Sequence, residues 1–204
     1  MQRRALVIGM VIVIALSAFI FVSTLQESFW YSRDTEVPVP FGDIIVREVS
    51  PGDRPSRLKI PALQIDTYIQ EVGVNGAGNM AAPSNFTDVG WYKHGTVPGF
   101  IGSAVVTGHV DNALSLPGIF KHLNALKPGD DVYIEKQDGS ELHFRVAETL
   151  TYPYANVPLK TLFSRSDMSR LNLITCGGTW LSHMKMYDER LVVYTELVSE
   201  QAGE

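Results

Sequence analysis

Short segments in which apolar and polar residues alternate recur along most of the chain. A period of two residues is typical of β-strands, whose side chains point alternately to opposite faces. Strand-like segments occur at residues 57–60, 65–72, 89–92, 103–109, 131–136, 141–150, 171–176 and 190–198. Helical spacing is confined to residues 116–126 and to a short turn at 159–165. About eight short strands with one or two short helices predict a mainly-β fold, a closed or nearly closed mixed β-barrel.

Loops between these segments have clear turn chemistry. The sequence Gln-Asp-Gly-Ser at 137–140 predicts a hairpin between two of the strands. Pro61 interrupts the first two alternating segments, and Pro-Gly-Asp at 128–130 ends the predicted helix. The chain therefore folds as a compact succession of strands without internal repeats.

The N-terminus has a different character. Residues 5–25 are uncharged and mostly apolar, and they follow Arg3 and Arg4. Their length fits a helix crossing a hydrocarbon core of about 30 Å, and it exceeds the apolar core of a cleavable signal peptide. We predict an uncleaved transmembrane signal anchor. The arginines place the N-terminus in the cytoplasm and the rest of the chain outside the cell membrane.

Four parts follow from this pattern. Residues 1–25 form the cytoplasmic end and the membrane anchor, and residues 26–56, which are rich in proline, form an extracytoplasmic stalk. Residues 57–199 form one folded domain, and residues 200–204 are a C-terminal tail.

Charge and cysteine content exclude several functions. The net charge is −5 and no basic run is present, so nucleic acid is not an expected partner. The single cysteine excludes an internal disulfide and a four-cysteine zinc site. Carboxylates do not cluster densely enough to require calcium, so a calcium site is possible but not indicated, and no cofactor is expected from the residues.

That cysteine, Cys176, is a candidate nucleophile. It follows the apolar strand-like run 171–175 and precedes Gly177 and Gly178, which we expect to turn the chain and leave the sulfur open at the end of the strand. The alternative is an inert structural cysteine, since free cysteine is among the most buried residue types.

A thiol nucleophile needs a base and a group that stabilises the oxyanion. Of the five histidines, His109 stands out because it follows an apolar strand through Gly108, as Cys176 follows its own strand. Arg190 opens the predicted last strand and could face a developing oxyanion. Each also has an ordinary interpretation: a structural histidine, and an arginine paired with Asp188 or Glu189.

Taken together, these residues resemble the signature of the sortases, the membrane-anchored cysteine transpeptidases of Gram-positive-type cell surfaces. The resemblance rests on Thr-Gly-His at 107–109, Leu-Ile-Thr-Cys at 173–176 and Arg190. It extends over residues 57–198 through Arg-Leu-Lys-Ile-Pro at 57–61, Gly-Trp-Tyr at 90–92 and Leu-Lys-Pro-Gly-Asp at 126–130. It implies a sortase-like closed eight-stranded barrel. The sequences His-Val-Asp at 109–111 and Thr-Cys-Gly-Gly at 175–178 look most like class F, whereas the placement of Arg190 looks more like class A.

The resemblance also implies roles. Cys176 would attack the Thr–Gly carbonyl of a sorting signal of the Leu-Pro-x-Thr-Gly (LPxTG) type, and His109 would protonate the departing amine. Arg190 would hold the substrate and the oxyanion. An amine of a cell-wall precursor, or water, would resolve the thioester. Thr175 and Asp111 are further candidates for substrate contacts, and Asp111 could instead orient His109 or cap its loop.

Two other functions remain open at this point. An L,D-transpeptidase, which cross-links the cell wall, also uses an exported cysteine and histidine, but its cysteine follows Ser-His-Gly. The second alternative is a non-catalytic, membrane-tethered β-domain that binds a surface ligand.

Overall fold

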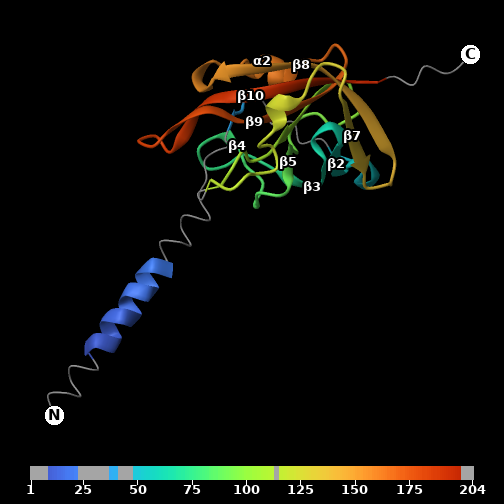
Figure 1. The fold of residues 1–204 in the computed structure, drawn as a ribbon. Helices are drawn as coiled ribbons and strands as arrows, with labels where there is room; N and C mark the ends of the chain where they lie inside the picture. Colours follow the sequence, from blue (N-terminus) through green and yellow to red (C-terminus); the bar gives the residue numbers. More distant parts are fainter. Residues whose placement is uncertain (1–8, 23–36, 41–47, 113–114, 199–204) are drawn as a thin grey trace, which may run out of the picture. The chain divides into compact units, whose positions relative to one another are not determined.

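The computed structural model describes residues 9–22, 37–40, 48–112 and 115–198. The chain divides into two compact units, Met1–Ser32 and Arg33–Glu204. In the first unit, residues 9–22 are helical (Figure 1, blue). Within the described ranges, no helix combines the length and the hydropathy that a membrane span requires. Residues 5–8 and 23–25 of the predicted anchor lie outside those ranges.

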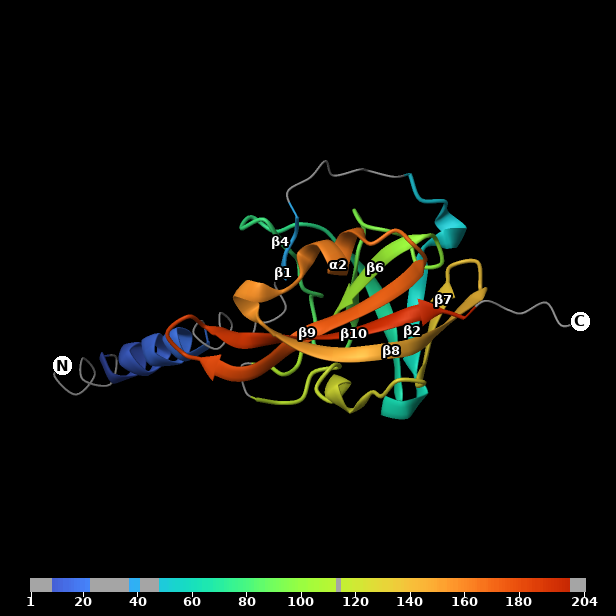
Figure 2. The same cartoon turned by 90° about the horizontal axis from the view of Figure 1, so that it is seen from above.

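The second unit is a closed β-barrel of eight strands (Figures 1 and 2). Around the barrel the order is β10-β8-β7-β2-β3-β5-β6-β9, in which β3–β5 and β6–β9 are parallel neighbours. The strands are β2 (Pro55–Ile60), β3 (Ile65–Val72), β5 (Val89–Tyr92), β6 (Gly102–Thr107), β7 (Asp131–Lys136), β8 (Glu141–Pro153), β9 (Ser169–Leu181) and β10 (Met186–Leu197). The mainly-β, closed eight-stranded barrel predicted from the alternating pattern is confirmed.

Short elements complete the unit. They are strands β1 (Val37–Pro38) and β4 (Asn79–Met80), helix α2 (Leu159–Ser164), and the 3₁₀ turns η1 (Pro51–Asp53), η2 (Pro61–Leu63), η3 (Leu123–Ala125) and η4 (Tyr154–Asn156). The turn expected at 159–165 is α2.

The helix expected over residues 116–126 was a wrong prediction. Only η3 forms there, because the backbone N–H groups that would build the helix bind neighbouring loops instead. Gly118 N–H donates to Val110 O over 3.0 Å, and Phe120 N–H donates to His109 O over 2.9 Å. The apolar residues still point inward, since Phe120 and Leu123 are fully buried. The helical spacing of the apolar residues in this segment therefore reflects their burial at the end of the barrel, and it does not indicate a helix.

Two apolar clusters lie on opposite faces of the barrel wall. The interior cluster includes Leu58, Phe144 and Leu171. The second cluster covers the outer face of β6, β9 and β10, where Ile174 and Val192 pack with residues from α2, β1 and β4. Helix α2 lies against β6 on this face (Figure 2).

Strand β1 falls within the segment that we predicted to be a stalk. Val37 pairs with Met80 of β4 and is only 1% exposed, packed in the outer cluster. This part of the segment belongs to the folded unit.

We therefore expect Val37→Ala to lower the free energy of unfolding. Removing two methyl-sized groups from a buried site costs about 1.5 kcal/mol or more at ~0.8 kcal/mol per group. Val39→Ala is the matched control, because Val39 is only partly buried and should lose less. Chemical denaturation of the Arg33–Glu204 unit measures both. Equal losses would contradict the integral packing of β1.

Candidate active site

Cys176 and Arg190 lie directly opposite each other on neighbouring antiparallel strands. Their Cα atoms are register partners in the β9–β10 ladder. Because side chains alternate along a strand, both share the outer face with Ile174 and Val192. Both side chains are about 1% exposed. The predicted nucleophile and the predicted oxyanion partner are thus brought together.

The strand that carries Cys176 does not end at the cysteine, contrary to our expectation for Gly177 and Gly178. Strand β9 continues to Leu181, and β10 begins at Met186, so Arg190 also lies inside its strand. Gly178 has a φ of +78°, and a Cβ there would overlap the Asp188 carboxylate. The second glycine therefore accommodates a bulge in a continuing hairpin, where the ladder shifts register between Tyr187 and Glu189.

His109 is placed by the parallel pairing of β6 with β9. Thr107 is the register partner of Ile174, and Gly108 N–H then donates to Ile174 O over 3.3 Å. His109 and Cys176 each lie two residues beyond the same pair of partners. Neighbouring strands are about 4.8 Å apart, so this register brings the backbone positions of His109 and Cys176 close together at one end of the β6–β9 pair.

The imidazole has a defined tautomer. Nε2 lies 3.1 Å from Pro83 O, and a carbonyl only accepts, so Nε2 carries the hydrogen. Nδ1 is buried, and the described residues supply it with no hydrogen-bonding partner. In the neutral ring Nδ1 is therefore the acceptor. The Phe86 ring packs against the imidazole with centroids 4.5 Å apart, which leaves His109 only 4% exposed.

Burial lowers the pKa of His109 below its ordinary value. The hydrogen bond to Pro83 and the negative charge of Asp111 act in the opposite direction but do not outweigh the burial. At neutral pH the ring is neutral and can accept a proton at Nδ1.

Arg190 is fixed by backbone carbonyls. Its Nη1 donates to Glu189 O over 2.8 Å and to Tyr187 O over 3.1 Å. The guanidinium carbon lies 4.6 Å from the centre of the Tyr154 ring. Carbonyl and ring contacts thus hold the guanidinium in a defined position, which suits a group that stabilises an oxyanion.

The two further candidates have structural contacts. The buried Thr175 hydroxyl donates to Gly108 O over 2.7 Å and joins the strand of the nucleophile to the strand of the base. Asp111 accepts a hydrogen bond from the Tyr187 hydroxyl over 2.6 Å. It also forms an ion pair with Lys121, with 3.4 Å between Oδ2 and Nζ.

Sequence reasoning missed four residues of this neighbourhood: Pro83, Phe86, Tyr154 and Tyr187. Pro83 and Phe86 lie in the loop between β4 and β5, Tyr154 lies in η4 and Tyr187 lies in β10, and no local pattern distinguishes them. The other histidines lie elsewhere or have other partners; His143, for example, contacts Asp131 over 2.7 Å.

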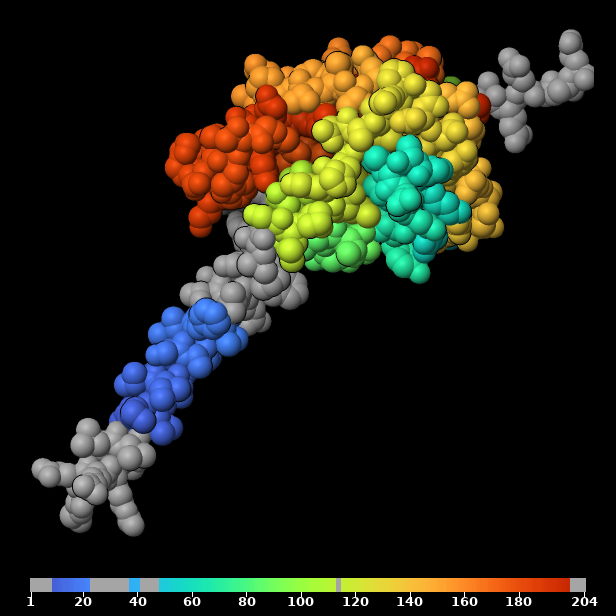
Figure 3. All heavy atoms as spheres, viewed as in Figure 1, coloured from blue at the N-terminus to red at the C-terminus, as the bar shows by residue number. Residues whose placement is uncertain are grey.

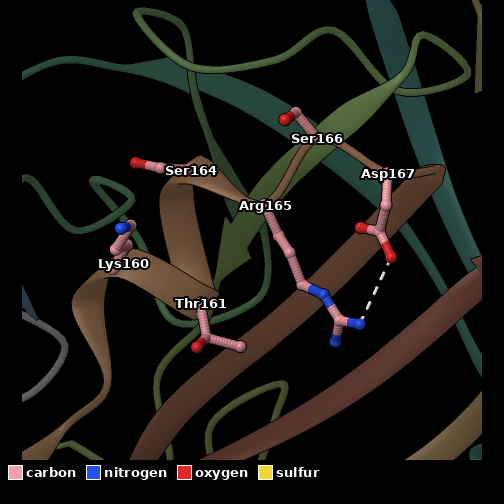
Figure 4. A pocket seen from close by; sticks show the side chains of 6 residues that line it. All are labelled: Lys160, Thr161, Ser164, Arg165, Ser166 and Asp167. Carbon is pink, nitrogen blue, oxygen red and sulfur yellow. Dashed lines mark hydrogen bonds and ion pairs between the residues drawn. The ribbon is translucent and has the colours of Figure 1, made fainter.

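A shallow pocket of about 420 Å³ lies beside α2, away from these residues. It is lined by Lys160, Thr161, Ser164, Arg165, Ser166 and Asp167 (Figure 4). Arg165 pairs with Asp167 across it over 3.2 Å. The pocket contains none of the predicted catalytic groups. Across the described ranges, no cluster of three or more His, Cys, Asp or Glu side chains could hold a metal ion.

Comparison with protein families decides between the alternatives. The sequence profile described as "Sortase domain" matches residues 58–198. The chain belongs to the sortase family. Sortases are cysteine transpeptidases, so this match favours the sortase interpretation over an L,D-transpeptidase. Comparison with curated proteins found no match.

Solved sortase structures share the fold of this sortase at low identity. Streptococcus pneumoniae sortase C is 18% identical with a TM-score of 0.58, over 88% of this chain and 86% of that chain. Corynebacterium diphtheriae sortase A is 20% identical with a TM-score of 0.54, over 74% of this chain and 63% of that chain. The Clostridium perfringens sortase D5 transpeptidase is 18% identical with a TM-score of 0.54, over 74% and 83%.

Gly118 allows the loop after His109 to close. A Cβ at Gly118 would overlap the backbone carbonyl of His109, which cannot move without shifting the imidazole. We expect Gly118→Ala to destabilise this sortase by about 1–3 kcal/mol. Gly76→Ala is the control, since nothing lies within 4 Å of that position. Thermal unfolding of both variants tests this, and a Gly118→Ala protein as stable as the control would refute it.

The lowered pKa of His109 predicts how stability changes with pH. Between its folded pKa and the ordinary value of 6.5, the unfolded chain binds a proton that the folded chain does not. The free energy of unfolding should therefore fall as the pH drops below 6.5. His109→Gln cannot titrate and should lose less stability between about pH 7.5 and about pH 5.5. Denaturation at several pH values measures the two slopes, which should differ.

Proposed function

We propose that this sortase is a membrane-anchored cysteine transpeptidase that cleaves a sorting signal of the LPxTG type between Thr and Gly. The observation that carries the proposal is the register of three neighbouring strands. It sets Arg190 opposite Cys176 and extends β6 so that His109 lies beside the same cysteine. A nucleophile, a base and a cation then share one face of the barrel.

Acylation uses all three groups. As Sγ of Cys176 attacks the carbonyl carbon of the substrate threonine, Nδ1 of neutral His109 accepts the thiol proton. The carbonyl oxygen becomes an oxyanion, and the Arg190 guanidinium stabilises it. When the C–N bond breaks, His109 gives the proton to the departing glycine amine, and the acyl group remains on sulfur as a thioester.

Deacylation reverses these roles. An incoming amine attacks the thioester carbonyl, His109 removes the proton from that amine, and the sulfur leaves as the new amide bond forms. Protonation of the thiolate by His109 restores the starting state. An amine of a cell-wall precursor is the proposed acceptor, and water gives hydrolysis instead.

Access to the sulfur requires movement. Cys176 is 1% exposed, and the face that carries it is covered by side chains from α2, β1 and β4, including Val37 and Leu162. A peptide carbonyl reaches Sγ only after part of this cover opens, as lids do in many enzymes.

The setting of the reaction is also part of the proposal. The apolar segment 5–25 after Arg3 and Arg4 supports a single-pass anchor with the catalytic unit outside the cell membrane. Surface proteins that carry sorting signals are the proposed substrates. We also propose that the chain is a class F sortase, because the motifs around His109 and Cys176 resemble that class. The placement of Arg190 resembles class A instead.

The activity is tested with an LPxTG-type peptide and an added amine. Cys176→Ala should abolish both cleavage and transfer, and a thiol alkylator should do the same to the unchanged chain. His109→Ala and Arg190→Ala should each lower the rate by about 10²-fold or more. The controls are His122→Ala and Arg145→Ala, which alter exposed side chains outside the β9–β10 pair. Mass spectrometry should detect the acyl group on Cys176. Normal turnover by Cys176→Ala would rule the proposal out.

A further inference from the structure

The catalytic groups come from two parts of the chain that share little backbone pairing near the site. His109 belongs to the loop after β6, whereas Cys176 and Arg190 belong to the β9–β10 hairpin. The pairing of β6 with β9 ends at Thr107 and Ile174. The ladder sets the backbone positions of His109 and Cys176, and contacts between the loop and the hairpin beyond that point contribute to how their side chains are oriented.

The hairpin itself extends past the barrel. Strand β8 pairs with β10 only as far as Glu189, so Met186 and Tyr187 pair only with Leu181 and Trp180 of β9. Figure 3 shows this orange-red lobe standing out beside the yellow-green loop between β6 and β7. A two-stranded ribbon is marginally stable by itself, so its base needs an anchor.

One side-chain contact supplies such an anchor. The Tyr187 hydroxyl donates to Asp111 Oδ2 over 2.6 Å, across 76 positions of sequence. Asp111 lies two residues after His109, is only 7% exposed and also pairs with Lys121. Hydrogen bonds to a carboxylate are short and about twice as strong as bonds between neutral groups.

Tyr187 also contacts the other half of the site. Its carbonyl accepts a hydrogen bond from Arg190 Nη1 over 3.1 Å. Its ring meets Trp180 edge to face, with centroids 5.2 Å apart, and Trp180 lies on the strand of Cys176. One residue thus connects the segment of the base, the strand of the nucleophile and the guanidinium.

We propose that Tyr187 is a positioning residue, whose hydroxyl bond to Asp111 holds the β9–β10 hairpin in place against the loop that carries His109. Its effect on turnover rests on the proposed function. The bond itself acts on the geometry between imidazole and sulfur, whatever substrate the sulfur attacks.

The variant that isolates this bond is Tyr187→Phe. It keeps the ring against Trp180 and the carbonyl against Arg190, and it removes only the hydroxyl. Small misplacements of reacting groups can cost up to about 10²-fold in rate. We expect kcat for peptide cleavage to fall about 10-fold. KM should change less than about threefold, because the strands that form the face carrying Cys176 are held by the barrel and do not depend on this hydroxyl.

A double-mutant cycle with Asp111→Ala tests whether the two side chains act together. The full-length chain is used in detergent, with Tyr68→Phe as the matched control because Tyr68 is exposed on β3. If the bond carries the effect, the double variant is no slower than the slower single variant. Multiplied effects, or a Tyr187→Phe enzyme as fast as Tyr68→Phe, overturn the proposal.

A second measurement needs no peptide. The rate at which iodoacetamide alkylates Cys176 is followed against pH, and its midpoint reports the coupling of thiol and imidazole. The midpoint should shift in Tyr187→Phe and stay in place in Tyr68→Phe; identical profiles count against the bond. A shifted profile in a chain that cleaves no sorting peptide would refute the proposed function and leave the positioning role intact.

Discussion

The parallel pairing of β6 with β9 is the constraint on which the site depends. Thr107 and Ile174 are the last register partners, and the base and the nucleophile follow at the same offset on adjacent strands. The Thr175 hydroxyl adds a buried bond to Gly108 O at this junction. Antiparallel pairing of β9 with β10 then makes Arg190 the register partner of Cys176. Two ladders, one parallel and one antiparallel, thus define the three-residue arrangement.

Burial determines the electrostatic state of this arrangement. The apolar surroundings of His109 lower its pKa and favour the neutral ring, while Pro83 O selects the hydrogen on Nε2. Backbone carbonyls and the Tyr154 ring contact the guanidinium of Arg190 in its buried position. In the proposed mechanism the neutral imidazole accepts the thiol proton, and the guanidinium stabilises a negative charge that develops only during the reaction.

Much of the fold, and the residues proposed for the site, could be predicted from local sequence. Alternating residues in β2, β3, β7 and β8 gave the barrel, because one face of each strand is buried. Cys176, His109 and Arg190 were predicted as site residues because each adjoins an apolar strand, and the β6–β9 and β9–β10 ladders place their backbone positions close together. The failures share one cause, which is that long-range contacts override local pattern. Residues 116–126 have helical spacing but bind the loop of His109, and Gly178 continues a bulged hairpin instead of ending a strand. Tyr187 could not be recognised, because its partner Asp111 is 76 positions away.

His109 and Cys176 each lie two residues beyond the register partners Thr107 and Ile174, and this has a consequence for how much the sequence of such a barrel can vary. The backbone positions of His109 and Cys176 are set by strand spacing, which any apolar sequence with the right alternation reproduces. Loops that do not contact these two segments can change length and composition without moving those backbone positions. The same barrel is accordingly compatible with sequences that are only 18–20% identical, as the solved sortase structures show. The backbone placement of the two positions depends on the alternation and register of the strands more than on the identity of their apolar residues.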